Sequence, residues 1–179
     1  MSGHSHWSGI KHRKGAADQK RGLVFSKLLA AITAAARAEQ NPDFNPRLRT
    51  AVQKAKEANV PSENIERAVK RAKESGGALE ELTLEAYGPG GTALLIEAIT
   101  DNKNRTIPEI KKILNAEGAK WAEPGSVRWA FSEASADKRG NWTAKFLQKL
   151  NKEDAEKLNV LVGALEDNDD VQKVYTNAA

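Results

Sequence analysis

The spacing of apolar residues changes twice along the chain, and each change marks a different kind of structure. Residues 2–22 show no apolar period, which predicts an extended arm. From Leu23 to about Glu39, apolar residues recur every three or four positions, as on the buried face of an amphipathic helix. Later the period becomes two, which is typical of strands. The pattern therefore predicts an arm over 1–22, a helical domain over 23–77 and a domain with strands over 78–179.

Two more helices are expected to complete the helical domain. Asn45 is a suitable N-cap for the second, and Pro46 fits its first helical position. This helix is expected to end at Ala58. The third helix follows Pro61-Ser62 and stops at Gly76-Gly77. Because the apolar faces of these helices are rich in alanine, we expect a three-helix bundle with a thin core.

Strand and turn signals follow the double glycine. Leu82 to Tyr87 alternate apolar and polar residues, which predicts an edge strand. Gly88-Pro89-Gly90-Gly91 then turns the chain into the apolar run from Thr92 to Ile99, which we expect to be the central strand beside it. Thr106 and Glu109 fit a capping box at the start of a helix that covers the sheet.

The last third of the chain continues this alternation. Residues from Val127 to Phe131 predict a third strand, and Asp137 to Gly140 a turn. The stretch from Trp142 to Leu150 fits a strand, although a helix also fits. Asn151 caps a last helix, and Asp170 to Asn177 closes the sheet. We therefore expect an α+β fold, with helices on one face of a mostly antiparallel sheet.

Charge is distributed unevenly along the chain, whose formal net charge is +4. Up to Ser75 the chain holds 15 Lys and Arg against 7 Asp and Glu, whereas the remainder holds 13 against 17. A solvated surface accounts for a small net charge, but segregation of this kind is more typical of a surface that binds a polyanion. The first part of the chain is therefore the expected nucleic-acid-binding part.

The arm combines cations with a large aromatic ring. Lys and Arg neutralise phosphates and release counterions, and Trp7 offers a face on which an unpaired base can stack. This mixture favours RNA or single strands over duplexes; the alternative is a disordered basic tail with Trp7 packed against the helices. Lys103 and Arg105 either extend this surface or belong to an ordinary turn. The predicted nucleic-acid-binding residues are Trp7, Lys11, His12, Arg13, Lys14, Lys20, Arg21, Lys27, Arg47, Arg49, Lys103 and Arg105.

Other chemistry is not indicated by the sequence. There is no Cys, and His4, His6 and His12 have few acidic neighbours, so no metal site is expected. Asp101 has no His or second acid at a telling distance, which argues against general acid/base catalysis. No stretch approaches the roughly 18 apolar residues of a membrane span. We therefore expect a cytoplasmic protein that is not an enzyme, with no cofactor, membrane or small-molecule substrate.

Several short motifs resemble the signature sequences of the YebC/PmpR family. Gly3-His4-Ser5, Trp7 and Ile10-Lys11-His12-Arg13-Lys14 stand in the arm in family order. Others follow across almost the whole chain. They are Lys20-Arg21-Gly22, Asn45-Pro46-Arg47-Leu48-Arg49, Asn64-Ile65-Glu66-Arg67-Ala68, Tyr87-Gly88-Pro89-Gly90-Gly91, Thr100-Asp101-Asn102, Asn104-Arg105-Thr106, Gly125-Ser126-Val127 and Val174-Tyr175-Thr176-Asn177.

The resemblance implies a helical first domain and an α/β second domain into which a third domain is inserted. It also implies a non-enzymatic protein, because family members are described as DNA-binding transcriptional regulators or as translational activators that ease ribosome stalling at proline-rich stretches. His6 stands where the family usually has Lys. The segment between Val127 and the last motif is short, so we expect the third domain to be missing near 134–141.

We therefore expect a nucleic-acid-binding regulator of gene expression. The favoured interpretation is a ribosome-associated translation factor whose arm binds ribosomal RNA. The alternative is a DNA-binding transcriptional regulator, which needs side chains that read base edges. On the second helix, Arg47, Arg49, Gln53 and Lys56 are the residues available for that role.

Overall fold

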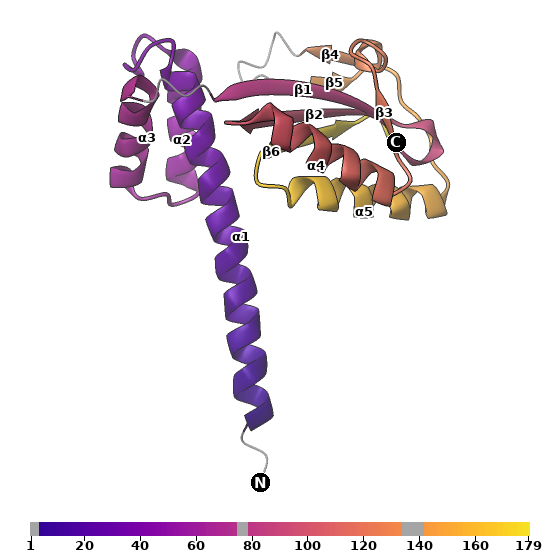
Figure 1. Cartoon of the computed structure of the whole chain (residues 1–179), viewed down its shortest axis with the longest axis horizontal. Helices are drawn as coiled ribbons and strands as arrows, with labels where there is room; N and C mark the ends of the chain where they lie inside the picture. The colour runs from indigo at the N-terminus through magenta and orange to yellow at the C-terminus, as the bar shows by residue number, and fades with distance from the viewer. Residues whose placement is uncertain (1–3, 75–78, 134–141) are drawn as a thin grey trace.

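The protein consists of a helical region and a sheet region, which one long helix connects in the computed structural model (Figure 1). The structure describes the backbone of residues 4–74, 79–133 and 142–179 and, except for Glu133, their side chains from Gly15 onward. The elements are α1 (His4–Ala36), α2 (Pro46–Glu57), α3 (Ser62–Glu74), β1 (Glu80–Tyr87), η1 (Pro89–Gly91), β2 (Ala93–Thr100), α4 (Lys103–Ala116), β3 (Lys120–Ala122), η2 (Arg128–Ala130), β4 (Phe131–Glu133), β5 (Trp142–Ala144), α5 (Lys152–Glu166) and β6 (Val171–Thr176).

The helical region is the expected three-helix bundle. The end of α1 packs against α2 and α3 through Ile32, Leu48 and Ile65, and the surrounding alanines allow the helices to approach closely. The Oγ1 of Thr33 donates to the carbonyl of Ala68 at 3.1 Å and so ties α1 to α3. The prediction of α2 and α3 from their caps and apolar spacing is confirmed.

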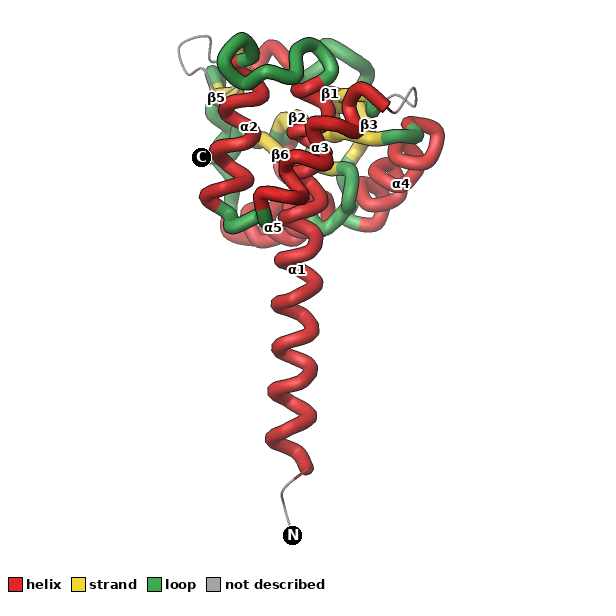
Figure 2. Tube along the Cα trace, turned by 90° about the vertical axis from the view of Figure 1, so that its left-hand side faces the viewer, coloured by secondary structure: helices red, strands yellow, loops and turns green. Residues whose placement is uncertain are grey.

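Residues 4–22 are helical and not extended, so this part of the prediction is wrong. α1 passes Gly15 and Gly22 without a break. Lys, Arg, Gln and Ala are good helix formers, and the packed end of α1 provides a nucleus from which the helix can propagate. The missing apolar period is consistent with a segment that has no packing partner among the residues that the structure describes. Figures 1 and 2 show this half of α1 projecting away from the rest of the molecule.

The main sheet has four antiparallel strands in the order β3-β1-β2-β6. One face, which includes Leu94 and Ile96, packs against α4 and α5. The other face, which includes Leu95, packs against η2 and the two-stranded sheet of β4 and β5. The predicted α+β fold with helices on one face of an antiparallel sheet is confirmed, and α5 and β6 lie where they are expected.

Two strands differ from the prediction. β1 is not an edge strand, because β3 pairs with it, with Ala86 opposite Trp121. The expected strand from Val127 to Phe131 is instead the 3₁₀ turn η2 followed by β4. The reason is Glu85, whose buried carboxylate accepts the backbone N–H groups of Val127 and Arg128 at 2.8 and 3.2 Å. Backbone donors bonded to a side chain cannot join a strand ladder.

The start of α4 and the segment before α5 also differ. α4 begins at Lys103 with Asn102 as its N-cap, whereas Thr106 is buried inside the helix and its hydroxyl lies 3.1 Å from the backbone carbonyl of Asn102. The capping box with Glu109 is therefore wrong. Only Trp142–Ala144 of the stretch ending at Leu150 forms a strand. The turn expected at 137–140 lies outside the described residues.

Candidate nucleic-acid interface

The projecting half of α1 carries most of the predicted nucleic-acid-binding residues. At a rise of 1.5 Å per residue, residues 4–22 make a rod about 28 Å long. Residues 15–22 are all exposed. Lys20 and Arg21 form no ion pair with a described residue, so both remain free to bind a phosphate. Trp7, Lys11, His12, Arg13 and Lys14 belong to the same helical backbone, nearer its free end.

Lys27 lies where α1 meets the sheet region. Its half-buried Nζ donates to the backbone carbonyl of Glu166, at the end of α5. Burial lowers the pKa of Lys27, whereas the nearby carboxylates of Glu166, Asp167 and Asp169 act in the opposite direction. The last carbonyls of a helix carry partial negative charge and attract a cation. Lys27 therefore connects the two regions and is not presented to solvent as Lys20 is.

The arginines of α2 are engaged within the chain. Arg47 forms an ion pair with Glu81 at the start of β1. Arg49 donates to the carbonyls of Pro42 and Asp43, at 3.1 and 2.8 Å. Gln53 donates to Glu57 on the same helix. Three of the four side chains predicted for base reading on this helix, all but Lys56, are therefore already bonded.

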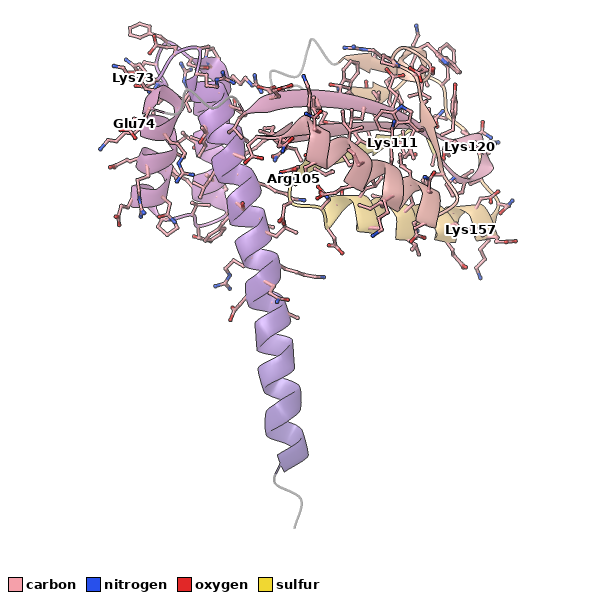
Figure 3. The ribbon with its side chains drawn as sticks, in the orientation of Figure 1. Lys73, Glu74, Arg105, Lys111, Lys120 and Lys157 are labelled. Atoms are coloured by element: carbon pink, nitrogen blue, oxygen red, sulfur yellow. The ribbon has the colours of Figure 1, made fainter. Side chains whose placement is uncertain are left out.

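The two cations near α4 lie among carboxylates. Lys103 pairs with Glu80 at 3.1 Å, and Arg105 pairs with Asp170 at 2.7 Å and Asp101 at 3.2 Å. The hydrogen bond from Arg105 to Asp170, supported by the charge of that carboxylate, raises the pKa of the guanidinium. Figure 3 shows Arg105 at the end of α4 that is nearer to α1. Both predicted cations are therefore paired with carboxylates of the chain.

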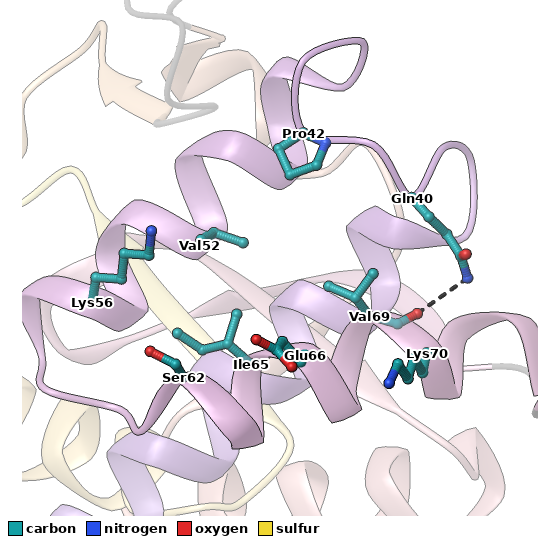
Figure 4. Close-up of a pocket in the computed structure, with 9 residues that line it drawn as sticks. All are labelled: Gln40, Pro42, Val52, Lys56, Ser62, Ile65, Glu66, Val69 and Lys70. Carbon is teal, nitrogen blue, oxygen red and sulfur yellow. Dashed lines mark hydrogen bonds between the residues drawn. The ribbon is translucent and has the colours of Figure 1, made fainter.

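A groove of about 460 Å³ lies on the helical region, between α2 and α3 (Figure 4). Val52, Ile65 and Val69 are its apolar lining, with Lys56 and Lys70 beside them. Gln40 closes part of it by donating to the carbonyl of Val69 at 3.2 Å. Within the described part of the chain, no group of three or more His, Asp and Glu residues has a geometry that could hold a metal ion. No helix there is long and apolar enough to cross a membrane.

Sequence comparisons agree with this architecture. The profile of the TACO1/YebC protein N-terminal domain matches residues 5–75. The profile of the TACO1/YebC second and third domain matches 79–138 and 136–178. The chain belongs to the TACO1/YebC family. A conserved hypothetical protein of Aquifex aeolicus has a crystal structure that superimposes with a TM-score of 0.82 at 33% identity, covering 98% of this chain and 97% of that one.

Two relatives of this TACO1/YebC protein illustrate the range of similarity. A probable transcriptional regulatory protein of Dictyoglomus turgidum is 52% identical over 136 residues, which cover 74% of this chain and 55% of the relative. One of Fervidobacterium nodosum is 39% identical over 235 aligned positions, which cover 99% of this chain and 93% of the relative. The chain thus matches only a little more than half the length of several relatives.

The structure of this TACO1/YebC protein also exposes a group of residues that the sequence analysis missed. Trp129 and Phe146 are 60% and 50% exposed, and their rings are in contact. Each follows a cation, Arg128 or Lys145. A cation followed by an aromatic residue, repeated in two segments, was the available signal. It was hidden because Trp129 fits an alternating strand pattern.

Proposed function

We propose that this TACO1/YebC family protein is a non-enzymatic, cytoplasmic regulator of gene expression that acts on the ribosome and eases stalling at proline-rich stretches. In this proposal the projecting half of α1 binds ribosomal RNA. The observation that carries it is a rod of about 28 Å that is rich in Lys and Arg and has no packing partner in the described residues. A helix that packs against nothing is only marginally stable in water, and a bound ligand can stabilise it.

The composition of the rod favours phosphate contacts over base reading. Residues 4–22 contain five Lys and Arg against one Asp, and Gln19 is the one amide side chain there. Phosphate contacts position a protein without selecting a sequence. On a folded RNA such as ribosomal RNA, the shape of the RNA can select the site instead. A translation factor needs no more specificity than this.

The deciding experiment compares the intact chain with a chain that lacks residues 1–22. Among the described side chains, the buried core clusters contain none from this segment, so we expect the shortened protein to remain folded. We expect it to lose co-sedimentation with ribosomes. Lys11→Ala or Arg13→Ala should each reduce the slope of log affinity against log salt concentration by about one. Lys152→Ala, at an exposed lysine of α5, is the matched control. Unchanged ribosome binding by the shortened chain would refute the proposal.

A DNA-binding transcriptional regulator is the second candidate, and the names of the relatives favour it. An α-helix with its side chains also fits the major groove of DNA. Its weakness is that Arg47, Arg49 and Gln53 are bonded within the chain. Retention on random duplex DNA and co-sedimentation with ribosomes at the same salt concentration separate the two. Stronger binding to one duplex sequence would favour the regulator of transcription.

We further propose that the family's inserted third domain is missing between β4 and β5. The two segments matched by the second profile meet there, near residues 136–138. The alignment with the Fervidobacterium nodosum relative has 235 positions, more than the 179 residues of this chain, so that relative has additional residues. Nucleic-acid binding through α1 does not depend on this domain, but the range of partners should be narrower.

A further inference from the structure

Two aromatic rings are exposed on the face of the sheet opposite α4 and α5. Trp129 belongs to η2, and Phe146 follows β5. Their ring centroids are 5.6 Å apart, with the planes tilted by 47°. Leu147 next to them is 67% exposed. We call Trp129, Phe146, Arg128 and Lys145 the aromatic platform. Large exposed rings that touch one another are uncommon on a surface without a binding role.

The rings of the aromatic platform are held in place. The Nε1 of Trp129 donates to the carbonyl of Ser126 at 2.8 Å, and the hydroxyl of Tyr87 donates to the same carbonyl at 3.0 Å. The backbone N–H groups of Lys145 and Phe146 donate to the carbonyl of Ala130. Because these contacts restrict the indole of Trp129 and the backbone that carries Phe146, less entropy is lost when a ligand binds.

Cations lie directly beside the rings. The Nζ of Lys145 is 5.4 Å from the centre of Phe146, and the guanidinium carbon of Arg128 is 4.8 Å from the centre of Trp142. Neither cation forms an ion pair with a described carboxylate. Flat rings with adjacent unpaired cations match a ligand that alternates flat bases with phosphates. An apolar protein partner would leave these charges without compensation.

We infer that the aromatic platform binds unpaired bases of single-stranded nucleic acid, with the phosphates at Arg128 and Lys145. This inference rests on the proposed function, because it gives the same protein a second contact for RNA. Base stacking tolerates any sequence, since every base has a flat face. The projecting helix supplies charge, whereas the platform recognises the absence of pairing.

The test uses the full chain and two labelled strands of equal length, a short oligouridylate and an abasic sugar-phosphate strand. Trp129→Leu and Phe146→Leu keep apolar volume but remove the flat ring. Each should weaken binding of oligouridylate about tenfold, and neither should change binding of the abasic strand. Phe44→Leu, at a ring that is 78% exposed in the helical region, is the matched control and should change neither. Circular dichroism and thermal unfolding establish that each variant is folded.

The outcomes separate this inference from the proposed function. If both variants bind oligouridylate as the wild type does, the binding role of the aromatic platform is refuted. The proposed function still stands in that case, provided that the chain without residues 1–22 loses co-sedimentation with ribosomes. If the wild type binds neither strand nor ribosomes, both are refuted. If the variants change only the sedimentation of the free protein, the surface binds a second copy of the chain, and the inference is wrong.

Discussion

At the scale of single residues, a few buried polar side chains fix the backbone where elements begin. Asn45 is 7% exposed and makes three hydrogen bonds. Its Oδ1 accepts from the N–H of Leu48 at 3.0 Å, and its Nδ2 donates to the carbonyls of Ala35 and Glu39 at 2.9 and 2.7 Å. The Asn45 side chain therefore caps the start of α2 and also bonds the carbonyls at and after the end of α1.

These bonds predict that Asn45→Asp destabilises the protein, although Asp is as good an N-cap as Asn in an isolated helix. The carboxylate keeps the acceptor but loses both donors and faces two carbonyls. We expect the free energy of unfolding to fall by about 2 to 3 kcal/mol. Urea denaturation measures this, with Asn41→Asp at an exposed position as the control. Equal stability of the two variants would mean that the donated bonds contribute little.

Tyr175 predicts a change of stability at alkaline pH. The residue is 8% exposed, and its hydroxyl donates to Glu97 at 3.3 Å. Burial, followed by the charge and hydrogen bond of Glu97, raises the pKa of Tyr175 from 10.0 to about 12. Since the protonated form is favoured in the folded state, its contribution is present below pH 10 and is lost as the pH rises toward 12.

The variant Tyr175→Phe cannot ionise at this position. Between pH 10 and 12, its free energy of unfolding should fall less steeply than that of the wild type. Urea denaturation at stepped pH values tests this, and both proteins share the titration of their lysines. Parallel curves would show that Tyr175 does not contribute.

At the scale of elements, Gly15 and Gly22 weaken the projecting half of α1. A Cβ at Gly15 or Gly22 would meet no atom within 4 Å. Changing either residue to Ala should stabilise the helix by about 1 kcal/mol, because glycine loses more backbone freedom on folding. Helical ellipticity and amide protection of residues 4–22 should increase. Ala17→Gly, on the same exposed stretch, should lower the ellipticity and the amide protection. If it leaves both unchanged, contacts other than helix propensity order this segment.

Elements with local causes could be predicted from the sequence, and those with distant causes could not. Asn45 and Asn151 mark helix starts because the cap bonds to residues three positions later. By contrast, β1 becomes an inner strand through β3, and η2 replaces a strand through Glu85. These contacts join residues about 35 to 42 positions apart. An alternating pattern around Val127 cannot reveal them.

The candidate site divides in the same way. The cations of residues 11–21 could be found from composition, because an unpacked segment rich in Lys and Arg has few other uses. The sequence could not show that Arg47, Lys103 and Arg105 have carboxylate partners, since Glu81, Glu80 and Asp170 come close only through the fold. Which of the predicted residues bind nucleic acid stays a prediction.

At the scale of the whole molecule, Lys27 connects the helical region to the sheet region. Lys27→Met keeps the apolar stem and removes the donor to the carbonyl of Glu166. We expect a loss of about 1 kcal/mol in the free energy of unfolding, with no change in the salt dependence of RNA binding. Lys20→Met should leave the free energy of unfolding unchanged and reduce the salt dependence of RNA binding, because Lys20 is exposed on the projecting helix. A reduced salt slope for Lys27→Met would instead place its ammonium group on a phosphate.

The unbroken course of α1 has a mechanical consequence. The same helix is part of the bundle core at Ile32 and reaches its free end about 28 Å beyond Gly22. From Thr33 in the bundle to the end at His4 the helix is about 43 Å long, so a tilt of about 10° at Thr33 would move that end by about 8 Å. Such a helix transmits small rotations at the bundle to its free end and also fixes a distance. Once its tip is anchored, the sheet region is held at a set distance and angle from the anchor, and slight repacking around Thr33 would be amplified at the tip.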